Sequence, residues 1–360
     1  MKRFLCAAAA LVLGGPTAHA QSVSIYGTLD AGVYAKQLAG TARTRNIDSG
    51  LMETSHLGFR GSEDLGGGLR AQFDLSTFLR LDSGEATRGV PGEGFWSRAA
   101  WVGLAGHWGA LRLGRISTQN FINNLRFNPF GPSSTVSPTF LHTYVGTPTQ
   151  PMTTGSGATD SAWSNSVAYG SPAFGGFTLA LQAAPGEGST AGRRFGGSIA
   201  YGTRGPFAAM LSFDRISRAA LAFPLALPAL AGSLPPYTAS ELQTVQLGAS
   251  YDFGAAKVFS QLARTTMDGT RATAPGNHEI ELSTLQLGLS APVGPGRALL
   301  SAARTDKAQR LLADRRRTTV TAGYDHDLSK RTDLYALAIS DRVSGLSNGT
   351  GWGAGIRHRF

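Results

Sequence analysis

The segment LRAQFDLSTFLRLD, residues 69–82, alternates between two kinds of side chain along its length. One face is mainly apolar and consists of Leu69, Ala71, Phe73, Leu75, Thr77, Leu79 and Leu81. The other face is mainly polar and consists of Arg70, Gln72, Asp74, Ser76, Phe78, Arg80 and Asp82. A period of two predicts a β-strand with one wet face. The apolar face fits either the core of a soluble sandwich or the lipid side of a membrane barrel, and periodicity alone leaves both open.

Segments with the same alternation continue along the chain, separated in turn by short turns and by longer gaps. The run Ser55–Leu65 ends in Gly66-Gly67-Gly68, which predicts a tight hairpin into residues 69–82. The segments that we interpret as strands are residues 22–34, 55–65, 69–82, 95–106, 110–117, 163–169, 177–184, 194–201, 207–216, 241–253, 256–266, 279–291, 297–305, 317–327, 333–343 and 349–360.

These sixteen segments favour the membrane alternative. Many run for about ten residues or more, which exceeds the roughly five or six of a globular sheet and matches a tilted bilayer crossing. An even number of strands, with short turns at one end and longer loops at the other, is typical of outer-membrane barrels. The sequence therefore predicts an all-β fold, a transmembrane antiparallel β-barrel of sixteen strands that is wide enough to leave an aqueous channel.

The first twenty residues have the pattern of a secretory signal peptide. Lys2-Arg3 precedes an apolar core, Phe4–Leu13, and Ala18-His19-Ala20 provides small residues for cleavage. We expect residues 1–20 to be removed during export, which lowers the formal charge from +10 to +8. No shift in composition marks a linker, so we expect residues 21–360 to form a single barrel domain.

Composition excludes several other classes of protein. The single cysteine, Cys6, lies in the expected signal, which leaves neither a disulfide framework nor a cysteine metal site. No later run of about 18 apolar residues predicts a transmembrane helix. The nearest candidate, Ala219–Leu234, is interrupted by Pro224 and Pro228, and we expect it to be a packed outer loop. An exported chain without helical spans can still enter a membrane as a closed β-barrel.

The stretch Thr118–Asp160 lacks the alternation found on either side of it. Its turn formers would break any strand or helix: Pro129, Gly131, Pro132, Pro138, Pro148 and Pro151. Between Arg115 and Asp160 it has no acidic residue. A structureless stretch of this length in a compact domain is usually functional or disordered. We interpret residues 118–160 as a constriction loop that folds into the barrel and narrows the pore, with a mobile surface loop as the alternative.

The last strand ends in an aromatic residue. Trp352, Ala354, Ile356, His358 and Phe360 share one face, and Gly353, Gly355, Arg357 and Arg359 share the other. A terminal aromatic on such a strand resembles the signal used by the outer-membrane assembly machinery. We therefore expect that machinery to be a partner through the strand that ends in Phe360.

Five stretches carry a resemblance to a known family: SVSIYGTLDAGV from Ser22, SHLGFRGSEDLGGGLRAQFDL from Ser55, RAAWVGLAGHWGALRLGR from Arg98, NSVAYGSPAFGGF from Asn165, and GIRHRF at the end. They resemble the Gram-negative general-diffusion porins, especially the beta-proteobacterial branch. Both ends and the first half match well, whereas residues 190–314 match more in pattern than in wording. The resemblance implies a homotrimer of 16-stranded barrels in the Gram-negative outer membrane, each with its third outer loop folded inward and with no cofactor. It also implies passive diffusion of small hydrophilic solutes and ions.

The inward loop departs from the pattern of that family. Porins of this kind usually carry acidic residues on the loop, facing arginines on the opposing wall. Here the groups of Thr118–Thr159 that are charged or titrate near neutral pH are Arg126 and His142. Uncompensated positive side chains in a pore lower the barrier for anions and raise it for cations. We therefore expect a mild anion preference.

Six residues are candidates for the pore lining: Arg60, Arg98, Arg115, Arg126, Asp30 and Asp74. A tilted strand gains roughly 2.5 Å of height per residue, which places Arg60, Arg98 and Arg115 near mid-height, with Asp30, Asp74 and Asp214 at similar levels. An arginine that faced lipid there would cost roughly 2 to 4 kcal/mol, so the watery side is expected. Because Arg60 and Asp74 lie on hairpin neighbours, a structural ion pair between them is an open alternative.

The remaining features leave other function classes open. Arg315-Arg316-Arg317 is a basic run, but at a strand end near an outer loop it favours a solvated rim or a contact with anionic lipopolysaccharide and outer-membrane lipid over nucleic acid. A barrel enzyme needs a Ser/His or Asp/His set on its wall, and we find none, nor any metal site. We expect no enzyme. A barrel enzyme, a substrate-specific channel and a soluble exported ligand-binding protein remain the alternatives.

Overall fold

The computed structural model describes residues 22–88, 93–144, 160–187, 192–202, 205–223, 237–271, 274–309 and 314–360. In these residues the chain forms one sheet of seventeen strands and two helices. The strands are β1 (Ser22–Lys36), β2 (Thr44–Ser49), β3 (His56–Gly66), β4 (Leu69–Phe78), β5 (Ala99–Gly106), β6 (Gly109–Ser117), β7 (Ala162–Gly170), β8 (Phe177–Ala184), β9 (Arg193–Tyr201), β10 (Phe207–Phe223), β11 (Tyr237–Asp252), β12 (Lys257–Arg271), β13 (Ala274–Val293), β14 (Gly296–Gln309), β15 (Arg315–Asp327), β16 (Thr332–Val343) and β17 (Gly349–Arg359). The expected signal, residues 1–20, lies outside the described residues, as does most of the apolar segment 219–234, whose first residues continue β10.

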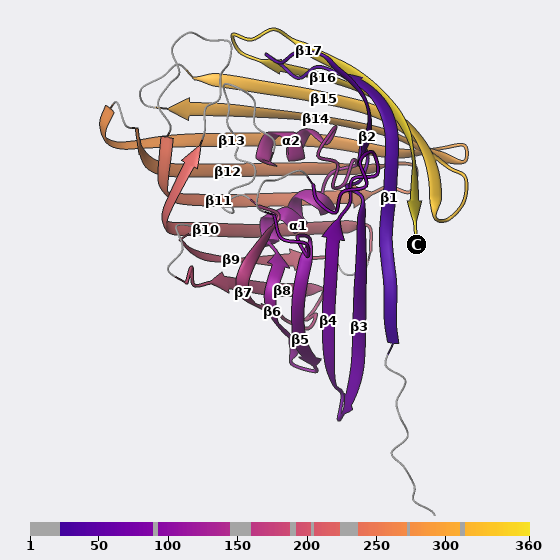
Figure 1. The fold of residues 1–360 in the computed structure, drawn as a ribbon, viewed down its shortest axis with the longest axis vertical. Coiled ribbons are helices and arrows are strands. Elements are labelled where there is room, and N and C mark those ends of the chain that lie inside the picture. Colours follow the sequence, from indigo (N-terminus) through magenta and orange to yellow (C-terminus); the bar gives the residue numbers. More distant parts are fainter. Residues whose placement is uncertain are drawn as a thin grey trace, which may run out of the picture.

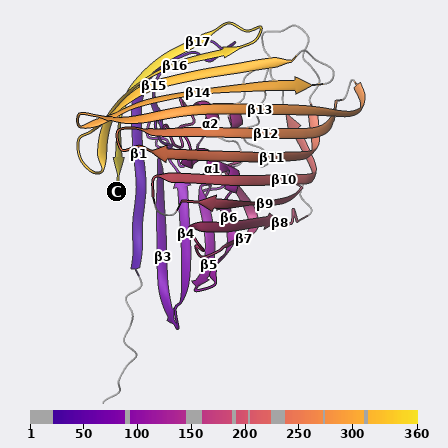
Figure 2. The ribbon, with the colours of Figure 1, turned by 180° about the vertical axis from the view of Figure 1, so that it is seen from behind.

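The sheet closes on itself as a barrel (Figure 1, Figure 2). Neighbouring strands from β3 to β17 pair antiparallel, and β1 pairs with β17. The other side of β1 pairs with β3 through residues 22–28 and with β2 through residues 31–36. Because β2 continues the position of β3 along β1, the wall is sixteen strands around. The transmembrane antiparallel sixteen-stranded barrel expected from the sequence is confirmed.

Strand β2 is the element that the alternation pattern did not indicate. Its sequence, TRNIDS, contains one apolar residue, Ile47, so neither face carries a hydrophobic signal. It forms because the upper part of β1 offers backbone groups that β3 does not reach, and β2 pairs with them from Ala31 to Lys36. Backbone pairing with a neighbour here outweighs the weak local preference.

The two ends of the barrel differ in their connections. At one end, short turns join β3 to β4, β5 to β6, and so on to β15 and β16. In the first of these turns Gly66, Gly67 and Gly68 have φ angles of 85°, 62° and 79°. Glycine adopts this left-handed region without the steric cost that other residues bear. Most connections at the opposite end are longer, and the longest lies between β6 and β7.

The strands are apolar outside and mainly polar inside. On β13, Leu285, Leu287 and Leu289 are exposed on the outer face, whereas Gln286 between them is completely buried on the inner face. The sets of exposed large apolar side chains on the other strands follow the same alternation. An apolar exterior around a polar interior is the arrangement of a barrel that lipid surrounds. No helix in the described part of the chain is long and apolar enough to span a membrane.

Two helices lie in the segment between β6 and β7, where the sequence indicated no regular element. They are α1 (Gln119–Arg126) and α2 (Pro138–Tyr144). The Oγ1 of Thr118 accepts a hydrogen bond from the amide of Phe121 and caps α1. Pro138 is the first residue of α2, where a missing amide proton has no cost. The expectation of an irregular insert was wrong here because helices of about two turns are too short to show a period.

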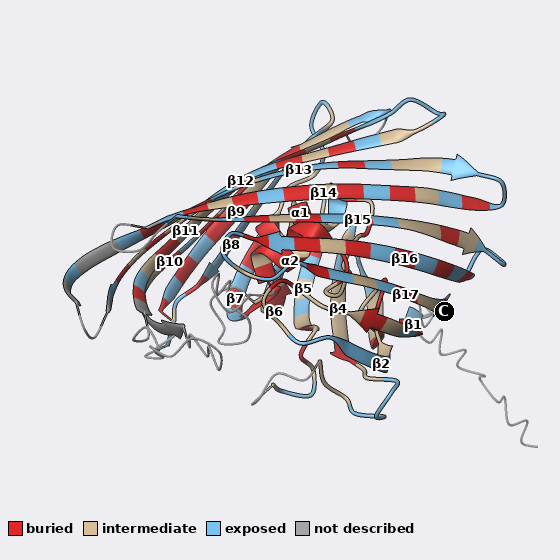
Figure 3. Cartoon of the chain, turned by 90° about the horizontal axis from the view of Figure 1, so that it is seen from above, coloured by how far each residue is buried: buried red, intermediate tan, exposed pale blue. Residues whose placement is uncertain are grey.

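The insert packs inside the barrel against one half of its wall. Helix α1 contacts β9, β10 and β11, and α2 contacts β13, β14 and β15. In Figure 3 both helices lie within the ring of strands, and most of α2 is buried, whereas the buried residues of α1 are Asn120, Asn123 and Asn124. Phe127 and Phe130 between the helices are 0% and 2% exposed, and burial of each contributes roughly 1.5 to 3 kcal/mol. The described part of the insert therefore packs on the inner wall, whereas residues 145–159 lie outside the described residues, and the narrowing of the pore by residues 118–160 stays a prediction.

Candidate functional site

Asn123 fastens α1 to the wall. Its side-chain amide nitrogen lies 3.0 Å from the carbonyl of Met210, 2.8 Å from the hydroxyl of Ser212 and 3.1 Å from the carbonyl of Gln246. The close approach requires Gly248 on β11, because a Cβ atom there would collide with Asn123 and with the ring of Phe127. Helix α1 thus packs closely on the inner wall through hydrogen bonds and through the space left by a glycine.

A buried ion pair fastens α2. Arg317 on β15 and Asp341 on β16 both have 0% exposure, and the Nε of Arg317 lies 2.9 Å from Oδ1 of Asp341. Arg317 also donates from Nη1 to the carbonyl of Leu141 at 2.9 Å, and Asp341 accepts from the amide of Ala39 at 3.0 Å. One pair therefore ties the wall to the insert and to the connection that follows β1.

His142 on α2 is buried beside that ion pair. Its two ring nitrogens lie 2.7 Å from the hydroxyl of Thr305 and 2.8 Å from that of Thr319, so one nitrogen donates and the other accepts. Burial, and then the nearby charge of Arg317, hold the pKa of His142 well below its ordinary value. The imidazole is therefore neutral at physiological pH. Protonation of His142 is unfavourable while α2 is packed against the wall.

The C-terminal end of the insert is held by two arginines. Asp160 lies 2.7 Å from Nη2 of Arg88 and 2.5 Å from Nη2 of Arg115. Burial by itself would raise the pKa of Asp160, but the two guanidinium groups outweigh it and leave that pKa lowered. Arg115 also donates to the carbonyls of Ser97 and Ala162. Arg115, a candidate for the pore lining, is thus half-buried, and its guanidinium binds the end of the insert.

Asp30 holds the connection between β2 and β3. It is completely buried, and its carboxylate accepts hydrogen bonds from the amides of Leu51, Met52 and Glu53 at 2.8 to 3.2 Å. The hydroxyl of Tyr335 donates to it as well, at 2.5 Å. Asp30 therefore organises the wall and presents no surface to water. Asp214, which was also expected near mid-height, is buried as well, at 8% exposure.

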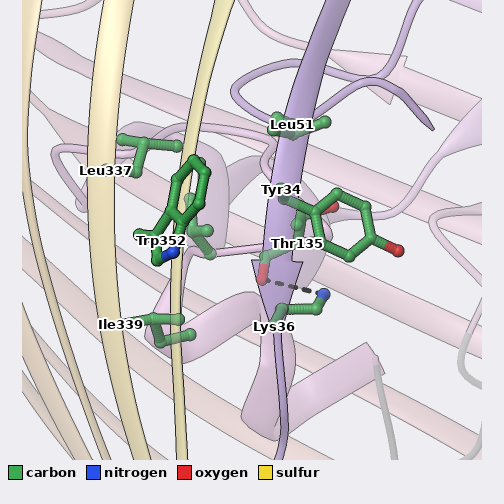
Figure 4. Close-up of a pocket in the computed structure, with 9 residues that line it drawn as sticks. Tyr34, Lys36, Leu51, Thr135, Leu337, Ile339 and Trp352 are labelled. Carbon is green, nitrogen blue, oxygen red and sulfur yellow. Dashed lines mark hydrogen bonds between the residues drawn. The ribbon is translucent and has the colours of Figure 1, made fainter. Parts of the chain in front are cut away.

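The insert and the β2–β3 connection meet behind β1. Figure 4 shows Leu51, Leu337 and Ile339 around a small cavity of about 10 Å³, where Lys36 donates from Nζ to the carbonyl of Thr135 at 3.4 Å. A space of that size holds about one water molecule at most. The packing between the insert and the wall is therefore tight at this point.

The wall across from the helices, β3 to β6 with the lower part of β1, carries an open cluster of charged and aromatic groups. The hydroxyl of Tyr26 on β1 lies 2.7 Å from both carboxylate oxygens of Asp74 on β4. The guanidinium of Arg60 lies 4.9 Å from the centre of the Tyr26 ring, and Nη1 of Arg98 lies 3.4 Å from the Tyr26 hydroxyl. Three of the predicted residues, Arg60, Arg98 and Asp74, are therefore brought together.

Arg112 belongs to the same cluster, although the sequence analysis did not select it. Its guanidinium lies 4.8 Å from the centre of the Trp101 ring, and it is exposed. Strand alternation indicates this position, because Arg112 alternates with Leu111 and Leu113, which are exposed on the outer face. The last predicted arginine, Arg126, is exposed on α1 and donates to the carbonyl of Gly202 at 3.3 Å, near a short turn.

A wider space of about 320 Å³ lies on the short-turn side of the insert. Residues 128–132 of the insert line one side of it, and basic wall residues line the other: Lys257, Arg297, Arg357 and Arg359. Asp325 and Asp333 partly neutralise these bases through contacts of 2.8 to 3.1 Å. Charged side chains of the wall therefore line one side of this space.

The basic run Arg315-Arg316-Arg317 separates into two environments. Arg315 and Arg316 are on the rim, where Arg315 donates to the carbonyl of Ser344 and Arg316 pairs with Asp306. Arg317 is completely buried against Asp341. The expectation of a solvated rim was therefore wrong for Arg317, because strand alternation turns it inward beneath α2.

A closed antiparallel barrel with an apolar exterior, a polar interior and an insert packed on its inner wall defines the class of outer-membrane channels. A family profile described as Gram-negative porin matches residues 7–345. The chain belongs to the Gram-negative porin family.

Individual relatives match over the full length. Outer membrane porin protein 32 of Delftia acidovorans is 32% identical over 390 aligned residues and is covered completely, as is this chain. Major outer membrane protein P.IB of Neisseria lactamica is 25% identical over 377 residues, again with 100% of both chains covered. Among solved structures, the anion-selective porin from Comamonas acidovorans has a TM-score of 0.75 and 29% identity, covering 95% of this chain and 100% of that one.

Proposed function

We propose that this outer-membrane channel for small hydrophilic solutes and ions has a mild preference for anions, set by Arg60, Arg98 and Arg112. The observation that supports it most is the charge balance across the opening. These three arginines lie in the same cluster as Asp74, which is half-exposed, while Asp30 is completely buried. The facing insert offers Arg126, and its sequence has no acidic residue between Thr118 and Thr159.

The physical effect of this arrangement is a positive potential at the narrowest part of the path. A positive ring lowers the entry barrier for anions and raises it for cations. The water-filled lumen screens charges over about 8 Å at physiological salt, so the preference is weak and shrinks as salt rises. The solved relative that is titled an anion-selective porin, at 29% identity, supports the same direction.

Reversal potentials in a planar lipid bilayer under a salt gradient test the proposal. The unmodified channel should favour chloride over potassium, and Arg98→Ala and Arg112→Ala should each lower that ratio. Arg264→Ala is the matched control, because it removes the same charge from an exposed position, on the strand face that carries Leu262. Clear cation preference of the unmodified channel at low salt would contradict the proposal.

We also propose that the mature chain starts after residue 20, forms a homotrimer and has no catalytic activity. Wide barrels leave much outer wall to cover between neighbours, and closed symmetric oligomers are the usual solution. Phe360 at the end of β17 would be read by the assembly machinery, and the rim arginines Arg315 and Arg316 would contact lipopolysaccharide. An unheated detergent gel tests the trimer, since a monomer band under the mildest extraction would contradict it.

A further inference from the structure

The side chain of Tyr26 crosses one strand to reach the next. Its partner on β3 in the strand register is Gly58, and a Cβ atom at Gly58 would collide with the ring and hydroxyl of Tyr26. The ring therefore lies flat over β3 and carries its hydroxyl to Asp74 on β4. Only a glycine at position 58 leaves room for this path.

This crossing changes the partner of Asp74. Arg60 and Asp74 stand directly opposite each other on β3 and β4, a position that favours a cross-strand ion pair. In the described residues no ion pair joins them, and the Tyr26 hydroxyl instead contacts both carboxylate oxygens of Asp74 at 2.7 Å. Arg60 lies over the Tyr26 ring at 4.9 Å. The open alternative of a structural Arg60–Asp74 pair is thus replaced by an arrangement in which Tyr26 stands between the two.

We propose that Tyr26 is a positioning residue that determines selectivity by holding Asp74 away from Arg60. A cation over a ring face is attracted without using its in-plane N–H groups. Those donors stay available for a passing anion with oxygen acceptors, such as a carboxylate or phosphate, which a guanidinium binds with two parallel hydrogen bonds. The inference deepens the proposed anion preference and rests on it.

The first test is Tyr26→Phe, which keeps the ring over Gly58 and beneath Arg60 but removes the hydroxyl. Asp74 is then free to pair with Arg60, and the chloride-to-potassium permeability ratio should fall about twofold, as expected for an interaction of roughly 0.4 kcal/mol. Asp74→Asn should raise the ratio. Because Tyr26 acts through Asp74, adding Tyr26→Phe to Asp74→Asn should change the ratio no further.

A second variant disturbs the same contact without changing any polar group. Gly58→Ala pushes the Tyr26 ring off its path and should lower the ratio in the same direction as Tyr26→Phe. Gly170→Ala is the matched control, because a Cβ atom there meets no other atom within 4 Å. Thermal unfolding of each variant in detergent verifies that the barrel is intact before conductance is compared.

The outcomes separate this inference from the proposed function. An unchanged ratio in both Tyr26→Phe and Gly58→Ala would overturn the inference, and so would an equal fall from Tyr26→Phe in the presence and absence of Asp74. Either result leaves the anion preference standing if Arg98→Ala still lowers the ratio. If the unmodified channel prefers cations, the proposed function fails first and the inference with it.

Discussion

The two halves of the barrel wall use the same residue type for different purposes. On the open half, Arg60 and Arg112 are exposed and touch aromatic faces. On the half covered by the insert, Arg317 has no exposure and is paired with an equally buried Asp341. The difference teaches that an insert in the lumen turns half of the inner wall into a protein core. Charge then sets the electric field on one half and the mechanical attachment of the insert on the other.

The largest effect on this difference between the two halves is expected from Arg317→Ala. It leaves the carboxylate of Asp341 buried without its cation, which costs roughly 3 to 5 kcal/mol of unfolding free energy. It also frees the carbonyl of Leu141, so α2 should detach and single-channel current should become larger or noisier. Urea unfolding in detergent and bilayer recordings measure the two effects.

Arg316→Ala is the control for that change. It removes the neighbouring arginine, which is 54% exposed and pairs with a half-exposed Asp306, and an exposed pair of this kind contributes at most about 1 kcal/mol. Equal losses from the two variants would contradict the division of the wall.

A smaller effect is expected where the insert rejoins the wall. Arg88→Ala leaves Asp160 with Arg115 alone and should cost roughly 1 to 2 kcal/mol. The lowered pKa of Asp160 means that this anchor is fully present above its unfolded pKa and is lost as the pH falls through the folded one. At neutral pH the anchor is fully present in the unmodified protein, so Arg88→Ala should there show its full cost in unfolding free energy. Limited proteolysis of the purified channel should then reveal a more accessible insert. Unchanged cleavage would show that Arg115 is sufficient.

Acid should loosen the covered half through His142. Its pKa in the folded protein is below that of the unfolded chain, so between the two values the unfolded chain binds more protons. Stability should fall as pH drops below about 6.5, by at most about 1.4 kcal/mol per unit for this one group. The charged groups that face it are Arg317, which opposes protonation, and Asp341, which favours it.

The measurement is the difference in unfolding free energy between about pH 7.5 and about pH 5. His142→Gln, which can still donate to and accept from the hydroxyls of Thr305 and Thr319, should show a smaller difference than the unmodified protein. His358→Gln, which changes an exposed histidine on β17, should not. A pH dependence identical in all three proteins would rule out His142 as the cause.

The smallest stability change is expected on the open half. Arg60→Ala removes an exposed side chain that makes no ion pair in the described residues, so unfolding free energy should shift by no more than about 0.5 kcal/mol. The reversal potential should nevertheless move toward cations. A large loss of stability would show that this arginine also holds the wall together.

The barrel could be predicted because strand alternation is a local property of the sequence. Residues 69–82 show it, and so do the exposed leucines around Gln286. The same pattern places Arg112 on the inner face, between the outward-facing Leu111 and Leu113. Burial on the inner face could not be predicted in this way. Asp30 is hidden because the connection at residues 51–53 folds back onto its carboxylate, a contact between segments that no period encodes.

The partners of the inner-wall charges also depend on more than two strands. The hairpin register did place Arg60 opposite Asp74. The ion pair does not form because Tyr26 arrives from β1 over Gly58, and such a three-strand contact is visible only when the barrel closes. Likewise, whether Arg317 faces water or protein is decided by α2, which comes from a different part of the chain.

The closure of the wall has a consequence for how the protein is made. The amide of Gly27 on β1 bonds to the carbonyl of Phe360 at 3.2 Å, and the reverse bond measures 3.1 Å. Synthesis runs from β1 to β17, so the edge of β1 that pairs with β17 keeps unpaired backbone groups until the last strand has been made. Such free edges are templates for aggregation. A chain that stopped before β17 would therefore keep unpaired backbone groups on β1 and β16, two edges open to aggregation in place of a closed wall.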